Sequence, residues 1–485
     1  MRTSSLVASV ALALAALGLA APALAAPPPI QKHTLPNGLD VIVVEDRAQP
    51  LVTVELAVKN GSMAEPPELN GLSHLYEHMF FKANQVLRDQ EAWTARALAL
   101  GMVWNGTTGT ERVNYYFSTT SDHFADTMAF MRDAVVAPLF DQKELERERE
   151  VVTGEMDRNE GNPFYFFGQA LDRRVWWKYP TRKDPLGYRK TVLGATRAQM
   201  QLIQGRYYVP NNSALVVTGD VTAAAVVALA GELYRDWKRA DDPFVKYPIP
   251  PHPPLPGTSV VVVEQPVGAV AGELVWHGPS TAGQDLSLTY AADVLGYALA
   301  EPSSRMQRAL VDSGACLGVS FSWLTQVHVG PITLFFQAMP DKVDGCVQAI
   351  LAELPKMRAP DYLSDDEMKN AAFRAELEQV ASREKPSELA HTLSFWWASA
   401  GLDYYLGYVE HMRRVTRADV VRFLDEYVLG KPFVLGALVS PEAAKGGLDQ
   451  AHFEALVGAK PYVPPPGTPE APRPGKPAPK KGGAP

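Results

Sequence analysis

The segment Gly71-Leu-Ser-His-Leu-Tyr-Glu-His-Met-Phe-Phe-Lys82 decides how the rest of this chain of 485 residues is interpreted. Apolar side chains fill most of the positions around its polar residues, and this predicts a buried helix over 71–82. At about 3.6 residues per turn, His74 and His78 leave the same face of that helix, and Glu77 lies beside them. Two imidazoles at this spacing can bind one metal ion.

The order His-x-x-Glu-His is the inverted form of a zinc-peptidase motif. Zinc lowers the pKa of a bound water to roughly 7, and a carboxylate beside that water can accept its proton. A surface helix with two solvated histidines is the alternative. The apolar neighbours argue against it, because buried imidazoles need polar partners. We therefore expect a site for one zinc ion at His74 and His78, with Glu77 as the general base.

A catalytic zinc needs a third protein ligand and keeps a fourth position open. The predicted helix over 141–156 offers five carboxylates, at Glu144, Glu146, Glu148, Glu150 and Glu155. A run of Glu and Arg is usually a solvated helix face. Glu155 follows this charged run, behind Val151 and Val152, where we expect a carboxylate to be buried. It is therefore the first candidate for the third ligand.

The order of predicted elements repeats after a proline-rich stretch. In the first half, the pattern of apolar residues predicts strands over 33–35, 39–44, 51–58, 114–120 and 213–217, and helices over 123–137, 141–156 and 223–237. The prolines of 241–257 indicate a semi-rigid linker. Strands over 259–264, 272–277, 319–324 and 332–338 follow, with helices over 286–299 and from 343. We expect two duplicated α+β domains, 26–240 and 258–462, joined by the linker 241–257.

The two ends of the chain carry different signals. Residues 1–25 combine an early charge at Arg2, an Ala/Leu-rich run and small residues before the end, which predicts a signal peptide cleaved after Ala25. An uncleaved membrane anchor is the alternative. We expect export across the inner membrane to the periplasm, with no stable membrane span after cleavage. Residues 463–485 are mostly Pro, Gly, Lys and Ala, which predicts a disordered tail.

The bulk composition restricts the class of protein. The formal net charge is -8, which argues against a nucleic-acid partner, because such a partner needs a basic face. The length exceeds that of one ordinary core and favours at least two domains. The only two cysteines, Cys316 and Cys346, exclude a disulfide-rich scaffold. Either a bridge between them or two buried thiols fits the sequence.

The chain resembles the pitrilysin/insulinase family of zinc peptidases, which includes the mitochondrial processing peptidase and small bacterial zinc peptidases. The resemblance implies Glu155 as the third zinc ligand and Glu148, seven residues earlier, as a supporting residue of the site. Asn105-Gly-Thr-Thr108 resembles the family's Asn-Ala-x-Thr edge strand, which implies that Asn105 and Thr108 contact the substrate backbone. Further family landmarks are matched by Tyr207-Tyr-Val-Pro-Asn-Asn212 and Val217-Thr-Gly-Asp220. The likeness covers about residues 30–463 and is weaker in the second half.

This resemblance also implies a fold and a reaction. The expected fold is α+β, with two duplicated domains that each pack an antiparallel sheet with helices and together form a clam-like chamber, alone or with a partner. The expected reaction is hydrolysis of unstructured peptides that bind as an added strand, so that main-chain hydrogen bonds supply the affinity.

One departure from the family pattern concerns the substrate clamp. Active members use an Arg and a Tyr of the second domain, near a Ser-Ser-Arg-Leu segment, to stabilise the oxyanion. Ser303-Ser-Arg-Met306 marks this place, and Val311 and Gly318 fall at the Arg and Tyr positions. A misplaced gap, with another Arg in the role, is the alternative.

We therefore expect the catalytic subunit of a heterodimer, in which a related chain supplies the Arg and the Tyr. A non-catalytic structural or peptide-binding subunit of the same fold is the alternative function.

Overall fold

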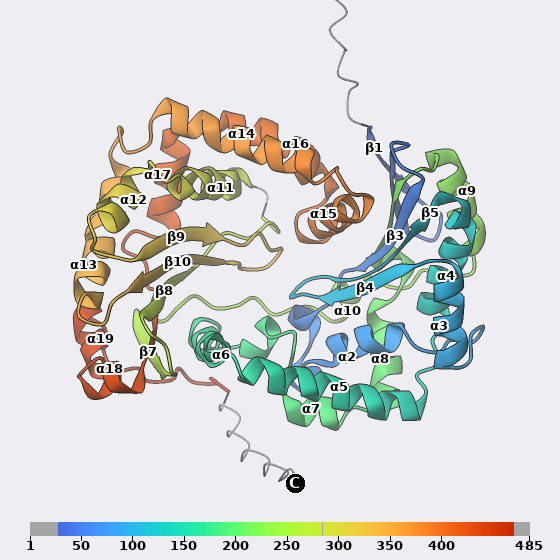
Figure 1. Cartoon of the computed structure of the whole chain (residues 1–485), viewed down its shortest axis with the longest axis horizontal. Helices are drawn as coiled ribbons and strands as arrows, with labels where there is room; N and C mark the ends of the chain where they lie inside the picture. The colour runs from blue at the N-terminus through green and yellow to red at the C-terminus, as the bar shows by residue number, and fades with distance from the viewer. Residues whose placement is uncertain (1–27, 284, 470–485) are drawn as a thin grey trace, which may run out of the picture.

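The computed structural model describes residues 28–283 and 285–469, which form two sheets on opposite sides of the molecule (Figure 1). The predicted signal peptide, residues 1–25, and residues 470–485 of the predicted tail lie outside the described residues and stay predictions. Within the described ranges, no helix has both the length and the apolar composition that a membrane span requires.

The first sheet contains six strands in the order β1-β2-β6-β3-β5-β4. They are β1 (Ile30–Thr34), β2 (Asp40–Glu45), β3 (Leu51–Val58), β4 (Val103–Thr108), β5 (Val113–Thr120) and β6 (Ser213–Gly219). All neighbours are antiparallel except β2 and β6, which run parallel. Strands β3 and β6 are buried on both faces, which explains their nearly continuous runs of Val, Leu and Ala. Strand β4 lies at one edge of the sheet, and β1 lies at the other.

The helices of the first half cover one face of the sheet or lie beyond it. They are α2 (Leu72–Phe80), α3 (Gln90–Ala99), α4 (Phe124–Val136), α5 (Gln142–Glu160), α6 (Pro163–Val175), α7 (Arg189–Leu193), α8 (Arg197–Tyr207), α9 (Ala223–Leu233) and the short α10 (Pro243–Lys246). Helices α2, α4 and α9 pack on the sheet, and α5 packs behind α2. This arrangement places α2 between the edge strand β4 and helix α5.

The second sheet repeats the first with one strand fewer, in the order β7-β11-β8-β10-β9. Its strands are β7 (Ser259–Glu264), β8 (Val270–His277), β9 (Gly318–Trp323), β10 (Pro331–Ala338) and β11 (Val434–Val439). Strands β7 and β11 form its one parallel pair. Its order matches β2-β6-β3-β5-β4 position by position. The predicted duplication is therefore present in the topology, and the sheets expected to be antiparallel each contain one parallel pair.

The helices of the second half follow the same plan. They are α11 (Ser287–Ala300), α12 (Arg305–Gln307), α13 (Val343–Glu353), α14 (Asp365–Ala381), α15 (Pro386–Ser399), α16 (Leu402–Arg414), α17 (Arg417–Tyr427), α18 (Pro441–Lys445) and α19 (Gln450–Val457). Cys316 and Cys346, on the approach to β9 and on α13, form a disulfide with their Cα atoms 5.0 Å apart. Of the two alternatives for these cysteines, the structure contains the bridge.

The two halves exchange one helix each. Helix α6 packs on β7 and β11 of the second sheet, and helix α15 packs on β3 and β6 of the first; both helices lie between the sheets in Figure 1. Phe167 and Leu171 of α6 approach Gly436 of β11 so closely that a Cβ there would lie 2.8 Å from the Phe167 ring. One face of each sheet is therefore covered by a helix that comes from the other half of the chain.

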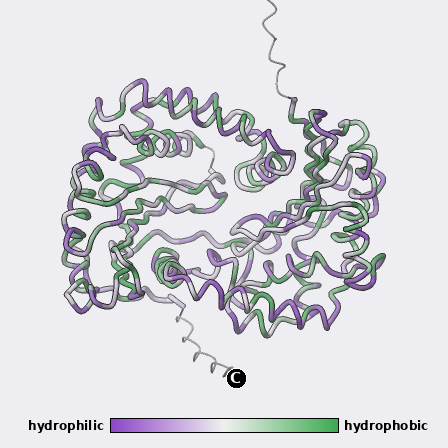
Figure 2. The backbone as a smooth tube through the Cα atoms, viewed as in Figure 1, coloured by the Kyte–Doolittle hydropathy of each residue, from purple (hydrophilic) through white to green (hydrophobic). Residues whose placement is uncertain are grey.

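Apolar residues follow this double packing. Figure 2 shows hydrophobic segments along the strands, whereas the outer helices alternate between hydrophilic and hydrophobic residues. On α15, Leu389, Leu393 and Trp397 join Val44 and Val216 of the first sheet in one buried cluster. Removing such contacts from water is worth about 1.5–3 kcal/mol for each large side chain. The exchange thus fixes the two halves, and the surfaces between them, relative to each other.

Candidate metal centre

The N-terminus of helix α2 is anchored by a buried carboxylate. Glu65 accepts the N–H of Gly71 at 2.8 Å and the N–H of Ser73 at 2.6 Å. These are N–H groups that a helix start leaves without partners. Burial raises the pKa of Glu65 to about 7. Gly71 has a φ of 83° and lies against Gly187, where a Cβ would meet the Gly187 Cα at 2.8 Å.

Replacing this anchor tests how firmly the helix is held. We expect Glu65→Ala to lower the free energy of unfolding by about 1–3 kcal/mol, because two buried N–H groups lose their acceptor. Glu68→Ala is the matched control, since Glu68 is exposed in the same loop, and it should change stability by less than about 0.5 kcal/mol. Urea unfolding of both variants measures the difference. Equal midpoints would show that water replaces the carboxylate.

His74 and His78 point their Nε2 atoms at a common position. The two Nε2 atoms are 3.3 Å apart, and the rings are almost perpendicular. A carboxylate oxygen of Glu155 on α5 lies 3.6 Å from Nε2 of His74, and its other oxygen lies 3.9 Å from Nε2 of His78. One donor atom from each residue thus falls within 4.8 Å of the others. The structure brings together the three residues predicted as ligands.

This arrangement fits a tetrahedral zinc ion. Donors about 2.0–2.1 Å from zinc lie about 3.3 Å apart along the edge of a tetrahedron, and the spacing of the two Nε2 atoms has this value. Burial, with a smaller contribution from His78, lowers the pKa of His74 to about 4, which keeps its ring neutral and able to donate a lone pair. Two imidazoles and one carboxylate are also a donor set that zinc enzymes use.

Glu148 orients the second histidine from behind. Its Oε2 lies 3.0 Å from Nδ1 of His78, and its Oε1 lies 2.8 Å from Nζ of Lys82. Burial opposes ionisation of Glu148, but the hydrogen bonds from His78 and Lys82 outweigh it and lower the pKa of the carboxyl. A proton held on Nδ1 leaves the lone pair of Nε2 free for the metal position. Glu148 therefore supports the site through His78, from the wall of the site and not as a ligand of the metal position.

Glu77 lies between the histidines and the edge strand. The hydroxyl of Thr108 donates to Glu77 Oε2 at 2.8 Å. Gly106 makes room for this carboxylate, because a Cβ there would lie 2.8 Å from both Cγ and Oε1 of Glu77. Burial raises the pKa of Glu77, while the bond from Thr108 acts in the opposite direction. One oxygen is thus held by β4, and the other remains available for proton transfer.

These residues line one cavity of about 480 Å³. Its walls are formed by His74, Glu77, His78, Phe81, Lys82, Trp104, Asn105, Gly106, Thr107, Thr108, Glu148 and Glu155. Asn105, predicted to contact the substrate, lies in this wall on the exposed side of β4. Its side-chain oxygen accepts a hydrogen bond from the N–H of Gly106. Lys82, Phe81 and Trp104 were not predicted as site residues. A signal for Lys82 was present, because in the predicted helix over 71–82 it follows His78 by four residues and would share its face; in the structure it lies just beyond the end of α2.

The expected burial of Glu155 was wrong. Its side chain is 27% exposed, whereas that of Glu148 is only 9% exposed, and Val151 is 47% exposed. The buried stripe of α5 consists of Leu145, Glu148, Val152 and Met156. Glu155 lies one position beside this stripe, where the helix borders the cavity. Its place at the metal position follows from this border and not from a buried environment.

The positions predicted to lack the substrate clamp carry no polar side chain. Val311 packs against the second core, and Gly318 begins strand β9. Cys316, between them, is buried and bridged to Cys346. Arg305, in the segment that marks the place, pairs with Asp361 at 2.9 Å on the surface. At these two positions the chain presents no side-chain donor for an oxyanion.

With this geometry in place, comparison with known proteins identifies the class. The profile of the family described as Insulinase (Peptidase family M16) matches residues 40–180, and that of the Peptidase M16 inactive domain matches residues 194–374. The chain therefore belongs to peptidase family M16, the insulinase family.

Relatives of known name and structure agree with this assignment. The zinc protease PqqE of Helicobacter pylori is 23% identical over 399 residues, which cover 81% of this chain and 89% of PqqE. A protease structure from the same organism superposes with a TM-score of 0.75 and 21% identity, covering 85% of this chain and 99% of that one. The periplasmic protease PqqL of Escherichia coli gives a TM-score of 0.70 with 18% identity, covering 89% of this chain but 50% of PqqL. The structural matches establish the shared fold.

Proposed function

We propose that this chain is a zinc-dependent endopeptidase that hydrolyses unstructured peptides. The observation that carries the proposal is the convergence of His74, His78 and Glu155 on one position, beside a carboxylate that the edge strand holds in place. Two solvated histidines on a helix surface are not expected to converge on one position with a carboxylate from another helix. They are also not expected to have Glu148 and Glu77 packed around them. Membership in a family with named zinc proteases supports the same reaction.

Each residue would have a distinct role. His74, His78 and Glu155 would hold one zinc ion, which supplies a Lewis acid for the scissile carbonyl and a water of pKa about 7. Glu77 would accept the proton of that water and return it to the leaving amine, because it lines the cavity together with both histidines. Glu148 would keep His78 in the tautomer that binds metal, with Lys82 balancing its charge.

The substrate would bind along strand β4. Among the strands of the described residues it pairs with β5 alone, so its outer edge offers backbone N–H and C=O groups to an extended peptide. Asn105 and Thr108 lie on this strand at the cavity. Because main-chain groups supply most of the contacts, only a segment without its own secondary structure can add to the edge. This favours unfolded peptides over folded proteins as substrates.

A related subunit would complete the site. Val311 and Gly318 cannot donate hydrogen bonds from their side chains to an oxyanion. The match to PqqL covers 89% of this chain but only 50% of PqqL, so PqqL contains a second part of similar length. We propose that a second chain of the family supplies an Arg and a Tyr at this point. The N-terminal sequence, and the periplasmic location named for PqqL, support the periplasm as the place of action.

The assembly is tested with the purified chain and an unstructured fluorogenic peptide in the presence of zinc. We expect slow hydrolysis by the chain alone and a large gain on adding a related chain that carries the Arg and the Tyr but lacks His-x-x-Glu-His. Full activity in a homogeneous monomer would contradict the heterodimer and leave the peptidase proposal standing. Zinc binding without hydrolysis in either preparation would favour the non-catalytic alternative.

A further inference from the structure

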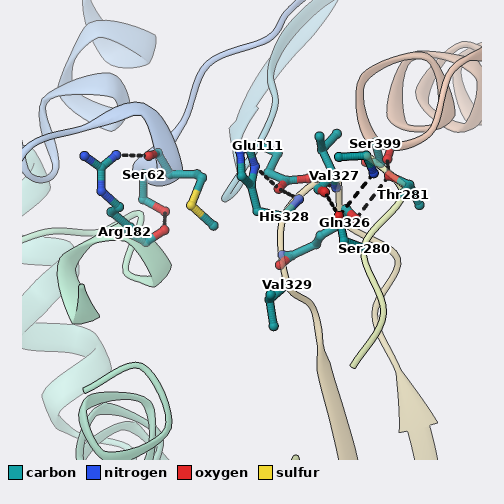
Figure 3. Close-up of polar contacts among 12 residues, drawn as sticks. Ser62, Glu111, Arg182, Ser280, Thr281, Gln326, Val327, His328, Val329 and Ser399 are labelled. Atoms are coloured by element: carbon teal, nitrogen blue, oxygen red, sulfur yellow. Dashed lines mark hydrogen bonds and ion pairs between the residues drawn. The ribbon is translucent and has the colours of Figure 1, made fainter. Parts of the chain in front are cut away.

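The turn between β4 and β5 reaches across to the second half of the chain. This turn, residues 109–112, directly follows Thr108, the last residue of the edge strand. It meets the loop between β9 and β10, residues 324–330, which we call the β9–β10 loop. Figure 3 shows Glu111 of the turn and His328 of the loop side by side between the two halves.

Glu111 is the centre of this contact. Its carboxylate accepts the N–H of Val327 at 2.7 Å and the N–H of His328 at 2.8 Å, and it lies 3.0 Å from Nδ1 of His328. The side chain is only 8% exposed. A buried carboxylate with three donors from another domain is a strong and directional link, because hydrogen bonds to a charged acceptor are about twice as strong as neutral ones.

The loop that Glu111 holds is itself fixed from both halves. Lys183, in the first half, donates to the carbonyl of Val329 at 2.7 Å and to the side chain of Gln326. In the second half, the N–H of Thr281 donates to the carbonyl of Gln326 at 3.0 Å. The β9–β10 loop is therefore a rigid partner for the turn, and not a free segment that follows it.

The same turn is also tied to the helix exchanged from the second half. Arg112 donates to the carbonyl of His391 at 2.8 Å and to the hydroxyl of Ser394 at 2.6 Å, both on α15. In the other direction along the chain, Thr108 donates to Glu77 at 2.8 Å. A single short segment, 108–112, thus connects the candidate general base to two elements of the second half.

We propose that Glu111 is a positioning residue that sets the place of β4, and through Thr108 that of Glu77, by docking the hairpin on the second half. This inference rests on the proposed function for its kinetic consequence, but its structural part does not. When the hairpin is docked on the second half, the edge strand lies where Thr108 reaches Glu77 and where a peptide strand can add to its edge. Loss of the docking leaves the metal ligands in place, because none of them lies on the hairpin.

The test compares Glu111→Ala with Asp122→Ala, which removes an exposed acid at the other end of β5. We expect Glu111→Ala to keep the wild-type zinc content, to speed hydrogen exchange of the β4 and β5 amides, and to lower kcat more than it raises KM. A small misplacement of reacting groups can cost up to about 100-fold in rate. The effect of His328→Ala should largely disappear in the Glu111→Ala background, because both act through one contact.

Two outcomes separate this inference from the proposed function. Faster exchange confined to the β9–β10 loop, with β4 and kcat as in the wild type, would overturn the positioning role. A wild-type protein without hydrolysis would overturn the proposed function, while the exchange of β4 would still decide the docking. If Glu111→Ala does not fold, Glu111→Gln, which keeps one acceptor oxygen, allows the same measurements.

Discussion

Glu77→Gln is expected to remove nearly all peptide hydrolysis while the protein keeps its zinc. A positioned general base contributes about 10²–10⁴-fold to the rate, and the amide cannot accept the proton. The amide has nearly the same shape and can still accept the hydrogen bond from Thr108, so the cavity should remain intact. Hydrolysis of an unstructured peptide and the zinc content of the same sample, in the active assembly, give the two readouts.

The matched control for this variant is Glu150→Gln. Glu150 is exposed on α5, and its replacement should leave both readouts unchanged. Undiminished hydrolysis by Glu77→Gln would assign the base to another group. Loss of zinc together with hydrolysis would mean that Glu77 helps to bind the metal. If the function of the protein is the same with and without Glu77, the structural alternative stands.

Glu155→Gln is expected to weaken zinc binding by more than the loss of a supporting residue does. Removing a residue behind a ligand typically costs about 10–100-fold in metal affinity, and a ligand itself contributes more. Only His74 and His78 would remain, with the neutral amide as a poor third donor. Competition with a chelator measures the affinity, and hydrolysis should fall in parallel because the metal is lost.

Glu148→Gln and Glu150→Gln are the comparison variants for the zinc affinity of Glu155→Gln. Glu148 is expected to act through His78, so its replacement should have a smaller effect on affinity, and Glu150→Gln should have none. Wild-type affinity in Glu155→Gln together with a large loss in Glu148→Gln would exchange the two roles. The position of Glu148, 3.0 Å from Nδ1 of His78, favours Glu148 as the supporting residue and Glu155 as the ligand.

Local sequence pattern predicted the elements that alternate or repeat cleanly. The predicted strand 51–58 has the bounds of β3, and the predicted helix over 71–82 contains α2. The predicted helix 223–237 is shorter in the structure and ends at Leu233. The chain turns after it, and Tyr234 and Trp237 are buried outside the helix. Helix α5 continues to Glu160, beyond the predicted Met156, and ends at Gly161.

The exchange of α6 and α15 could not be predicted from the sequence. Their apolar residues, such as Leu171 and Leu393, have the spacing of any helix that covers a sheet, and periodicity does not tell which sheet is covered. The pairing depends on contacts between residues far apart in the chain. The predicted linker 241–257 lies between the last strand of the first sheet and the first strand of the second. The packing of these two helices crosses it.

The candidate site was predictable where its residues share one helix. His74, Glu77 and His78 are placed by helical spacing alone, and Glu155 needed the family resemblance as well. Its contribution from α5 depends on how two helices pack, and the buried environment expected for it was wrong. Glu111 carried no recognisable signal, because its partners, the N–H groups of Val327 and His328, belong to the backbone of a distant loop.

The central claim is that His74, His78 and Glu155 hold one zinc ion beside Glu77. A crystal structure of the zinc-loaded protein, with anomalous data collected on both sides of the zinc absorption edge, tests it most directly. We expect one anomalous peak within about 2.0–2.2 Å of Nε2 of His74, Nε2 of His78 and a carboxylate oxygen of Glu155. A peak held by other residues, or none in zinc-saturated crystals, would contradict it.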